Sequence, residues 1–401
     1  MIYFIIFIYL LYLIFLYDIR GKENNKQQHF VMILLLMILV SGLRYRLGID
    51  TIVYMDDFSD YPTLSELKLN DFGDFRYQPL WILINSFSKS LGDFVFVQII
   101  TSIIHIGILG YVLKKICPSL IFSSLLFYYL FDFIILNMEV MRESCAISFF
   151  LLSALAIDDN RMTKAIIYIA IATLFHVFAL PVFIIFWLYY KFLSDRPVVG
   201  LFIAICTAII VMRKSDVLMM TILNLFTGNE DSQYIQRAVN YASNEKYGTG
   251  NWSIIGILTN LGKPVFYLFA FFYCRKTCEK YLTIGYKAFS AAIWISVILL
   301  FCIYSMPIFI RPYDYFHVFT YLLSILFFVQ VAAKFVKRLR PAVYMMLMVV
   351  PITFATKYYV HKETVVPNEY LYSRYYPYSS VFEKSTNSHR EHIYSYGNLL
   401  R

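Results

Sequence analysis

Charged residues are scarce in this chain. Asp, Glu, Lys and Arg make up only 15% of its 401 residues, whereas hydrophobic residues make up 60%. A soluble domain of this length would need far more polar surface to stay in solution. The formal net charge is +9, but the basic residues are scattered over short polar stretches, which argues against a nucleic-acid-binding protein.

Several kinds of functional motif are also missing. No P-loop, dinucleotide fingerprint or EF-hand pattern is present, so no nucleotide or calcium site is predicted. Cys274 and Cys278 lack a second Cys or His pair, which argues against a zinc site. The first apolar run has no basic n-region and no small-residue cleavage site, so we expect a membrane anchor rather than a cleavable signal.

Long apolar runs are the main feature that is present. Residues 1–17, 94–113, 120–136 and 254–272 each approach or reach the length of about 17–25 residues that a helix needs to cross a bilayer. Barrel strands would instead alternate with a period of about two over about ten residues. The runs therefore predict an all-α, polytopic integral membrane protein with about 12 transmembrane helices.

The distribution of Lys and Arg assigns a side to each loop, because short cytoplasmic loops carry an excess of both. It predicts a single transmembrane domain at residues 1–358, with long external loops at 44–76 and 213–251. Residues 359–401 are predicted to form an external polar tail. We expect residues 77–91 to form an amphipathic interfacial or re-entrant helix. Residues 165–190 should form two short helices that break between His176 and Pro181, because proline removes a backbone donor.

Ionisable residues collect on the predicted outer face, mostly at junctions between spans. The set comprises Arg44, Arg46, Asp50, Arg76, Glu139, Arg142, His176, Arg311 and Asp314. Arginines on this face oppose the positive-inside tendency, although any one of them could simply reach towards lipid headgroups. A guanidinium group binds phosphate oxygens through two parallel hydrogen bonds and stays charged at any working pH. Several arginines that face one volume therefore predict a pyrophosphate ligand.

A lipid-linked pyrophosphate would be the leaving group of a glycosyl transfer, and arginine would stabilise its developing charge. The attacking sugar hydroxyl would need a general base. The candidates for this base are Asp50, Glu139, Glu143, His176 and Asp314. Structural roles are the alternative: Asp50 could hold Arg44 or Arg46, Arg142 could pair with a neighbouring Glu, and His176 could be a packed core residue.

Short motifs follow one another along most of the chain. They are Tyr17-Asp18-Ile19-Arg20, Gly42-Leu43-Arg44-Tyr45 with Gly48, Asp50 and Tyr54, Tyr77-Gln78-Pro79-Leu80, Met141-Arg142-Glu143 with Ala146, Phe175-His176, residues 311–316, and Tyr376-Pro377-Tyr378. In this order they resemble the motifs of the EpsG family of Wzy-type polysaccharide polymerases. The chain departs from the family pattern at three positions: Thr51 replaces a Tyr, Gln78 a Glu and Glu143 a Gln.

The resemblance implies a multi-pass enzyme of the bacterial inner membrane with a GT-C-like architecture. Such an enzyme joins oligosaccharide repeat units carried on undecaprenyl pyrophosphate at the periplasmic face, to make O-antigen or a related surface polysaccharide. The family is expected to work without metal or nucleotide, so no cofactor is predicted. The implied partners are undecaprenyl-pyrophosphate-linked glycans and membrane lipids, with a chain-length regulator and a flippase as further partners.

On this interpretation Asp50, Glu139 and His176 are predicted to be catalytic. Binding of pyrophosphate or sugar is predicted for Arg44, Tyr45, Arg46, Arg76, Arg142, Arg311 and Asp314. Two alternatives stay open. A flippase or transporter of the lipid-linked unit would carry charged residues in a central cavity and usually two similar halves, and no internal repeat is visible. An O-antigen ligase would share the outer site and the lipid-pyrophosphate chemistry.

Overall fold

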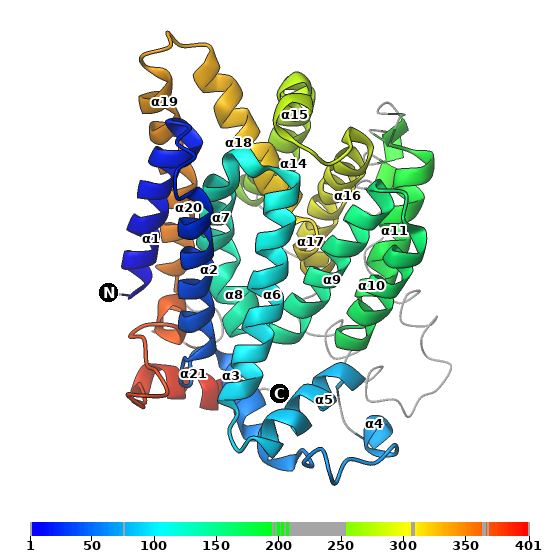
Figure 1. The fold of residues 1–401 in the computed structure, drawn as a ribbon, viewed down its shortest axis with the longest axis vertical. Coiled ribbons are helices and arrows are strands. Elements are labelled where there is room, and N and C mark those ends of the chain that lie inside the picture. The colour runs from blue at the N-terminus through cyan, green and yellow to red at the C-terminus, as the bar shows by residue number, and fades with distance from the viewer. Residues whose placement is uncertain are drawn as a thin grey trace. The chain divides into compact units, whose positions relative to one another are not determined.

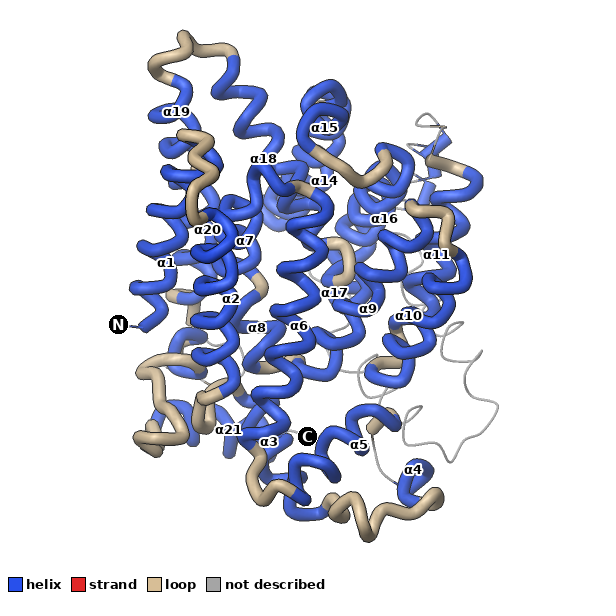
Figure 2. Tube along the Cα trace, viewed as in Figure 1, coloured by secondary structure: helices blue, strands red, loops and turns tan. Residues whose placement is uncertain are grey.

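The computed structural model describes most of the chain: residues 2–74, 77–194, 196, 199–200, 202–203, 206–207, 254–305, 309–362, 366 and 369–399. Within these residues the regular structure is helical, and β pairing is limited to isolated bridges (Figure 2). The predicted all-α class is confirmed. The predicted loop at 213–251, most of a predicted span at 197–212, and Arg76 lie outside the described residues.

The chain divides into two compact units. The first consists of Met1–Leu180, Tyr281–Thr283 and Phe328–Arg401, and the second of Pro181–Lys280 and Ile284–Phe327. Helix α18 (His317–Ala333) contributes residues to both units. The polar tail therefore belongs to the same unit as the N-terminal helices.

The first unit is built mainly from apolar helices (Figure 1). They are α1 (Ile2–Leu13) with its π-helical continuation (Ile14–Ile19), α2 (Lys26–Gly42), α6 (Val95–Ile116), α7 (Ile121–Phe131), α8 (Phe133–Met138), α9 (Met141–Asp158), α10 (Met162–Phe175), α19 (Arg340–Leu347) and α20 (Val349–Tyr359). Shorter elements connect or cap them: α3 (Ile49–Asp57), α4 (Asp71–Asp74), α5 (Pro79–Ser90), α21 (Ser388–Leu399) and 3-10 turns at Phe58–Asp60, Pro118–Leu120 and Leu371–Arg374.

The second unit contains α11 (Ala179–Phe192) from Pro181 onwards, α14 (Ile254–Tyr273), α15 (Arg275–Tyr281), α16 (Tyr286–Ser305), α17 (Ile310–Asp314) and the first part of α18. Aromatic side chains hold these helices together. The rings of Phe271 and Trp294 join α14 to α16 with centroids 6.1 Å apart, and those of Phe289 and Phe319 join α16 to α18 at 6.3 Å.

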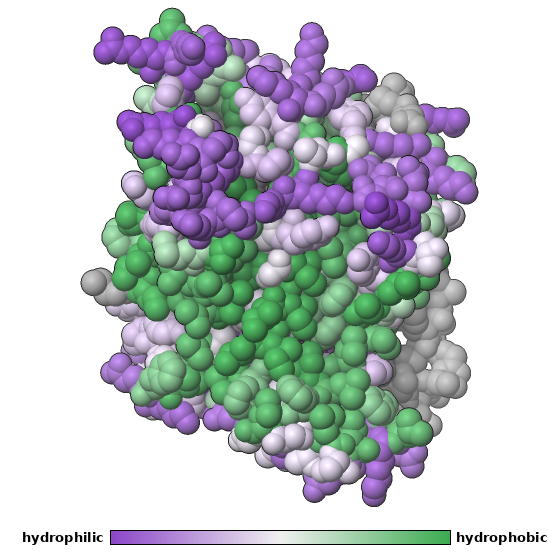
Figure 3. Space-filling view, in the orientation of Figure 1, coloured by the Kyte–Doolittle hydropathy of each residue, from purple (hydrophilic) through white to green (hydrophobic). Residues whose placement is uncertain are grey.

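Four helical segments are long and apolar enough to cross a membrane: Ile2–Ile19, Val95–Ile116, Tyr286–Ile303 and Arg340–Tyr359. Shorter apolar helices accompany them, among them α2, α10, α11 and α18. On the face drawn in Figure 3, hydrophobic side chains cover the middle of the first unit over α1, α2 and α6, and hydrophilic side chains gather at its two ends. An apolar surface of this kind suits contact with lipid. Together with the helices that are long enough to cross a membrane, it shows that the chain is a polytopic membrane protein.

The two ends of the first unit differ in charge. At one end, Lys114 donates a hydrogen bond to Gln27 (2.7 Å) and Lys115 pairs with Asp159 (2.6 Å). We call this the basic end. The opposite end carries α3, α5 and α21 (Figure 1), and we call it the α3 end. The loops that the sequence assigns to opposite sides of the membrane thus lie at opposite ends of this unit.

The helical structure that was predicted for two local stretches is confirmed. Residues 77–91 contain the helix α5, which buries Trp81 and Ile82 and exposes Phe87. The stretch 165–190 breaks after Phe175, and α11 begins at Ala179. Pro181 lies in the first turn of α11, where its missing N–H removes no intrahelical hydrogen bond.

Residues 43–48 connect α2 to α3, and together with the first turn of α3 they pack against the junction between α8 and α9. Gly48 has φ +88°, a conformation that L side chains rarely adopt, and a Cβ at this position would collide with the carbonyl oxygen of Met138. The Thr51 hydroxyl donates a hydrogen bond to the same carbonyl. Glycine is therefore required for α3 to approach this junction.

Gly48→Ala is expected to destabilise the protein by more than about 3 kcal/mol, because positive φ and a backbone collision act together. Gly92→Ala is the matched control: Gly92 has φ +99° but open space around it, so only about 1 kcal/mol should be lost. Unfolding in detergent measures both. Equal losses would show that the α8–α9 junction moves aside easily.

Candidate functional site

Three segments that are distant in the sequence meet at the α3 end: residues 43–51, 138–142 and 374–381. Backbone hydrogen bonds join the first to the third. The amide of Tyr45 donates to the carbonyl of Ser379 (2.9 Å), and the amide of Val381 donates to that of Leu43 (2.9 Å). The tail of the chain therefore continues the structure of the loop after α2.

The carboxyl group of Glu139 is the point at which these three segments are tied together. Its Oε2 accepts the backbone N–H of Asp50 at 2.8 Å, and its Oε1 accepts the hydroxyl of Tyr375 at 2.8 Å. The Arg374 guanidinium lies 3.5 Å from Oε1. Because the Glu139 side chain is only 8% exposed, these protein groups rather than water satisfy it.

The Asp50 carboxyl group influences the Glu139 carboxyl group at this point. Burial raises the pKa of Glu139 and the neighbouring Asp50 carboxyl raises it further, whereas Arg374 and the hydrogen bonds from Asp50 and Tyr375 oppose the rise. A carboxylate with a raised pKa is a stronger proton acceptor than an ordinary surface carboxylate. The Asp50–Glu139 pair is therefore suited to accept a proton.

Arg142 is held by aromatic rings on the same side of the first unit. It is the second residue of α9, and its guanidinium carbon lies 4.2 Å from the centroid of the Tyr77 ring and 5.7 Å from that of Tyr54. Nη1 donates to Oε1 of Gln78 at 2.8 Å, and Nε lies 3.4 Å from the Tyr54 hydroxyl. The guanidinium is thus fixed in orientation, as recognition of a phosphate group requires.

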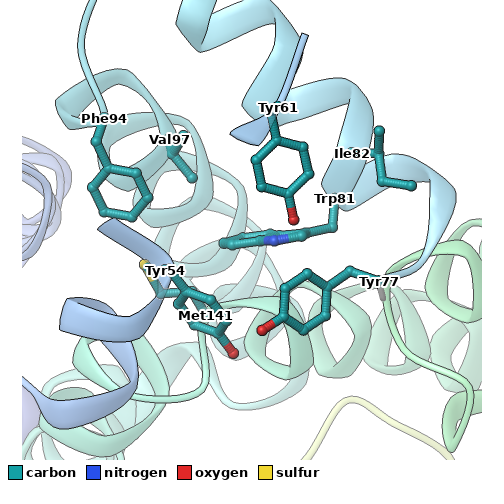
Figure 4. Packing of buried hydrophobic residues seen from close by; sticks show 8 residues of the cluster. All are labelled: Tyr54, Tyr61, Tyr77, Trp81, Ile82, Phe94, Val97 and Met141. Carbon is teal, nitrogen blue, oxygen red and sulfur yellow. The ribbon is translucent and has the colours of Figure 1, made fainter. Parts of the chain in front are cut away.

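A closed aromatic cluster supports Arg142. Figure 4 shows Tyr54 and Tyr77 on one side of the Trp81 indole and Tyr61 on the other. The Tyr54 and Trp81 ring centroids are 4.9 Å apart, and the Tyr77 hydroxyl donates to Asp57 at 3.1 Å. Since these rings are buried, they orient Arg142 and join α3 to α5 rather than offering an open face to a sugar.

Arg44 lies inside the structure. Its side chain is fully buried, and its guanidinium donates to the carbonyl of Ser41, to the Thr51 hydroxyl at 3.0 Å and to the Met141 sulfur at 2.9 Å. Burial lowers the pKa of Arg44 to about 10, so the group remains charged at neutral pH. These contacts join α2 to α3 and α9, so Arg44 has a structural role that the sequence did not indicate.

Arg46 pairs with the tail. Its Nε and Nη2 donate to the two carboxylate oxygens of Glu391 at 2.8 and 2.7 Å, and this carboxylate raises the pKa of Arg46. The ring of Tyr45 lies beneath the ammonium of Lys384, 5.6 Å from its centroid. Both predicted ligand contacts therefore interact with the C-terminal segment (residues 369–399).

The C-terminal segment is anchored by a second buried arginine. Arg390 is fully buried, and its guanidinium donates to the carbonyls of Arg374 (3.0 Å) and Pro377 (2.8 Å). The Tyr394 hydroxyl donates to Asp56. These contacts hold Arg374 and Tyr375 against Glu139.

The remaining predicted residues lie elsewhere. His176 occupies the break after α10, where its ring lies 5.4 Å from that of Phe178. Arg311 and Asp314 belong to α17 of the second unit, so their convergence with Arg142 stays a prediction. In that unit Asp314 lies 3.5 Å from Nε2 of His317.

Sequence reasoning missed Arg374, Tyr375 and His317 as members of these clusters. The sequence does show that a polar, Tyr-rich stretch, which contains Arg374 and Tyr375, follows the last apolar run. Nothing in its local sequence indicates that this stretch folds back onto Glu139. Within the described part of the chain, no group of three or more His, Cys, Asp or Glu side chains could hold a metal ion.

Residues 27–380 match the family model described as the EpsG family. The chain belongs to the EpsG family. The match includes the first two segments that meet at Glu139 and the third up to Ser380. It ends before α21, so the helix that carries Arg390 and Glu391 lies beyond it. No curated protein and no solved structure matches the chain. EpsG membership, together with the apolar helices, makes this a membrane protein of polysaccharide biosynthesis.

A double-mutant cycle with Arg46→Gln and Glu391→Gln should give a coupling free energy of about 1 kcal/mol, because the pair is bidentate and partly buried. The exposed pair Lys26–Glu23, with N and O 3.4 Å apart, should couple by less than about 0.5 kcal/mol. Unfolding in detergent measures both cycles. A coupling near zero for the first pair would mean that it does not hold α21.

Proposed function

We propose that this EpsG-family protein polymerises oligosaccharide repeat units carried on undecaprenyl pyrophosphate, at the periplasmic face of a bacterial inner membrane. The α3 end of the first unit would face the periplasm. The observation that carries this proposal is that a carboxyl pair, Asp50–Glu139, and an oriented arginine, Arg142, come together at the end of the unit opposite the basic loops. Family membership supports the substrate class.

The reaction is a glycosyl transfer. A hydroxyl of the incoming unit attacks the anomeric carbon of the growing chain, a new glycosidic C–O bond forms, and the C–O bond to the lipid pyrophosphate breaks. The hydroxyl proton passes to the carboxyl pair. The pyrophosphate leaves with the electron pair of the broken bond, and Arg142 stabilises its charge.

The proposal assigns different roles to the arginines. Arg142 is the phosphate contact, because its planar group is already oriented by Tyr77 and Gln78. Arg44 and Arg46 support the loop that presents Asp50. Arg311 and Asp314 of the second unit are proposed as further contacts to the substrate, and His176 as a second proton-transfer group, on the strength of the sequence motifs.

Deletion of the gene should leave surface glycan that carries a single repeat unit, because units are still made and exported but not joined. Arg142→Ala should give the same product and lower chain elongation by at least about 100-fold. Arg161→Ala, at the basic end, is the control and should give long chains. Loss of all repeat units in the deletion strain would instead indicate a flippase or a ligase.

The orientation can be tested with introduced cysteines. Leu69 is 88% exposed at the α3 end, and Asn24 is exposed in the loop between α1 and α2. Leu69→Cys should react with a membrane-impermeant maleimide in intact spheroplasts, and Asn24→Cys only after permeabilisation. The wild-type chain gives the background. The reverse pattern would place the candidate site on the cytoplasmic side.

A further inference from the structure

The C-terminal segment does more than cover the loop after α2. It brings two polar side chains, the Arg374 guanidinium and the Tyr375 hydroxyl, to the same carboxylate oxygen, Oε1 of Glu139. The other oxygen is occupied by the backbone N–H of Asp50. Both oxygens of this buried carboxyl group therefore accept hydrogen bonds from protein donors, and two of these donors lie on the C-terminal segment.

We infer that Arg374 and Tyr375 are positioning residues that keep the Glu139 carboxylate ionised and oriented beside Asp50, so that Glu139 accepts the proton of the attacking hydroxyl. This inference rests on the proposed glycosyl transfer. It names the proton acceptor among the candidates and assigns the C-terminal segment to the active site. In the step itself, the hydroxyl O–H bond breaks, the proton bonds to a carboxylate oxygen, and the hydroxyl oxygen forms the glycosidic bond.

The physical argument is electrostatic. A carboxylate that is withdrawn from water becomes costly to ionise, and the second carboxylate beside it adds to the cost. A cation and hydrogen-bond donors reverse this cost. Arg374 supplies the cation and Tyr375 supplies a donor, and both lower the pKa of Glu139 against the effect of burial. Without them Glu139 would retain a proton and could not accept another.

Other polar groups near Glu139 do not replace these two. Arg44 interacts electrostatically with Glu139, but its guanidinium donates hydrogen bonds to Ser41, Thr51 and Met141. Tyr3, from α1, donates to the backbone carbonyl of Tyr375 (3.2 Å) and so supports the tail rather than the carboxyl group. Asp50, from α3, contributes negative charge and its backbone N–H.

Two hydrogen bonds fix the backbone of the C-terminal segment beside Glu139. Arg390 holds the carbonyl of Arg374, and the amide of Gly48 donates to that same carbonyl at 3.1 Å. The backbone of residue 374 is thus fixed from two sides. Its side chain and that of Tyr375 have a defined place beside Glu139.

The test uses the full-length protein in proteoliposomes, with lipid-linked repeat units extracted from the gene-deletion strain as substrate. Chain elongation is measured from acidic to alkaline pH for the wild type, Tyr375→Phe and Arg374→Gln. Each substitution raises the pKa of Glu139, so the acidic limb of the pH–rate profile should move to higher pH. We expect a shift of about one unit for Arg374→Gln and less for Tyr375→Phe.

Two comparisons make the result specific. Tyr372→Phe changes an exposed tyrosine of the same 3-10 turn, whose ring stacks on Tyr370, and should leave the profile unchanged. Arg374→Lys retains the positive charge and should restore most of the shift caused by Arg374→Gln. Tyr375→Phe retains the ring, so it should remain folded even if Arg374→Gln does not.

The outcomes separate the inference from the proposed function. If the wild type elongates chains and the variants show lower rates by the same factor at every pH, or no change, Arg374 and Tyr375 do not control the proton acceptor and the inference is wrong while the function stands. If the wild type itself forms no polymer from these units, the proposed function fails and the inference fails with it.

Discussion

The carboxyl group of Glu139 connects the parts of the chain that would have to act together. It receives the Asp50 amide from α3, the Tyr375 hydroxyl from the C-terminal segment and the approach of Arg374, while its own backbone lies between α8 and α9. A buried acceptor that lost these donors would carry a large desolvation cost. The three segments are therefore held in place by the need to satisfy one ionisable group.

Close packing around this group restricts where each segment can lie. Gly48 touches the carbonyl of Met138, and the Arg44 guanidinium lies between α2, α3 and α9. The aromatic cluster of Tyr54, Tyr77 and Trp81 fixes Arg142 on the neighbouring turn. The result is a polar site whose members come from separate helices but whose distances are set by rigid contacts, as preorganised catalysis requires.

The apolar helices could be predicted from the sequence because each depends on a local property, a run of apolar residues of sufficient length. The break after Phe175 could be predicted for the same reason, since Pro181 acts locally. The short polar helices α3 and α21 lie in segments that were predicted only as an external loop and tail. The direction in which an arginine side chain points is not local. Arg44 and Arg142 looked alike as outer-face arginines. Arg44 is nevertheless enclosed between α2, α3 and α9, whereas Arg142 lies on the rings of Tyr54 in α3 and of Tyr77, two residues before α5.

The role of the tail was the main gap. Its polarity and its many tyrosines indicated an external segment, but the pairing of Arg46 with Glu391 spans most of the chain length and leaves no periodic signal. Long-range ion pairs of this kind depend on how the helices return to the same end. The family match, which ends at residue 380, does not include the residues that anchor this segment either.

The position of Arg374 and Tyr375 has a consequence for biogenesis. These residues leave the ribosome after the described helices α1 to α20 have been made, so Glu139 stays without these two partners until residues 374 and 375 follow. A chain interrupted after α20 would insert its helices and still lack the donors for Glu139. The contacts of Glu139 with Arg374 and Tyr375 thus form later in synthesis than the apolar helices that surround them.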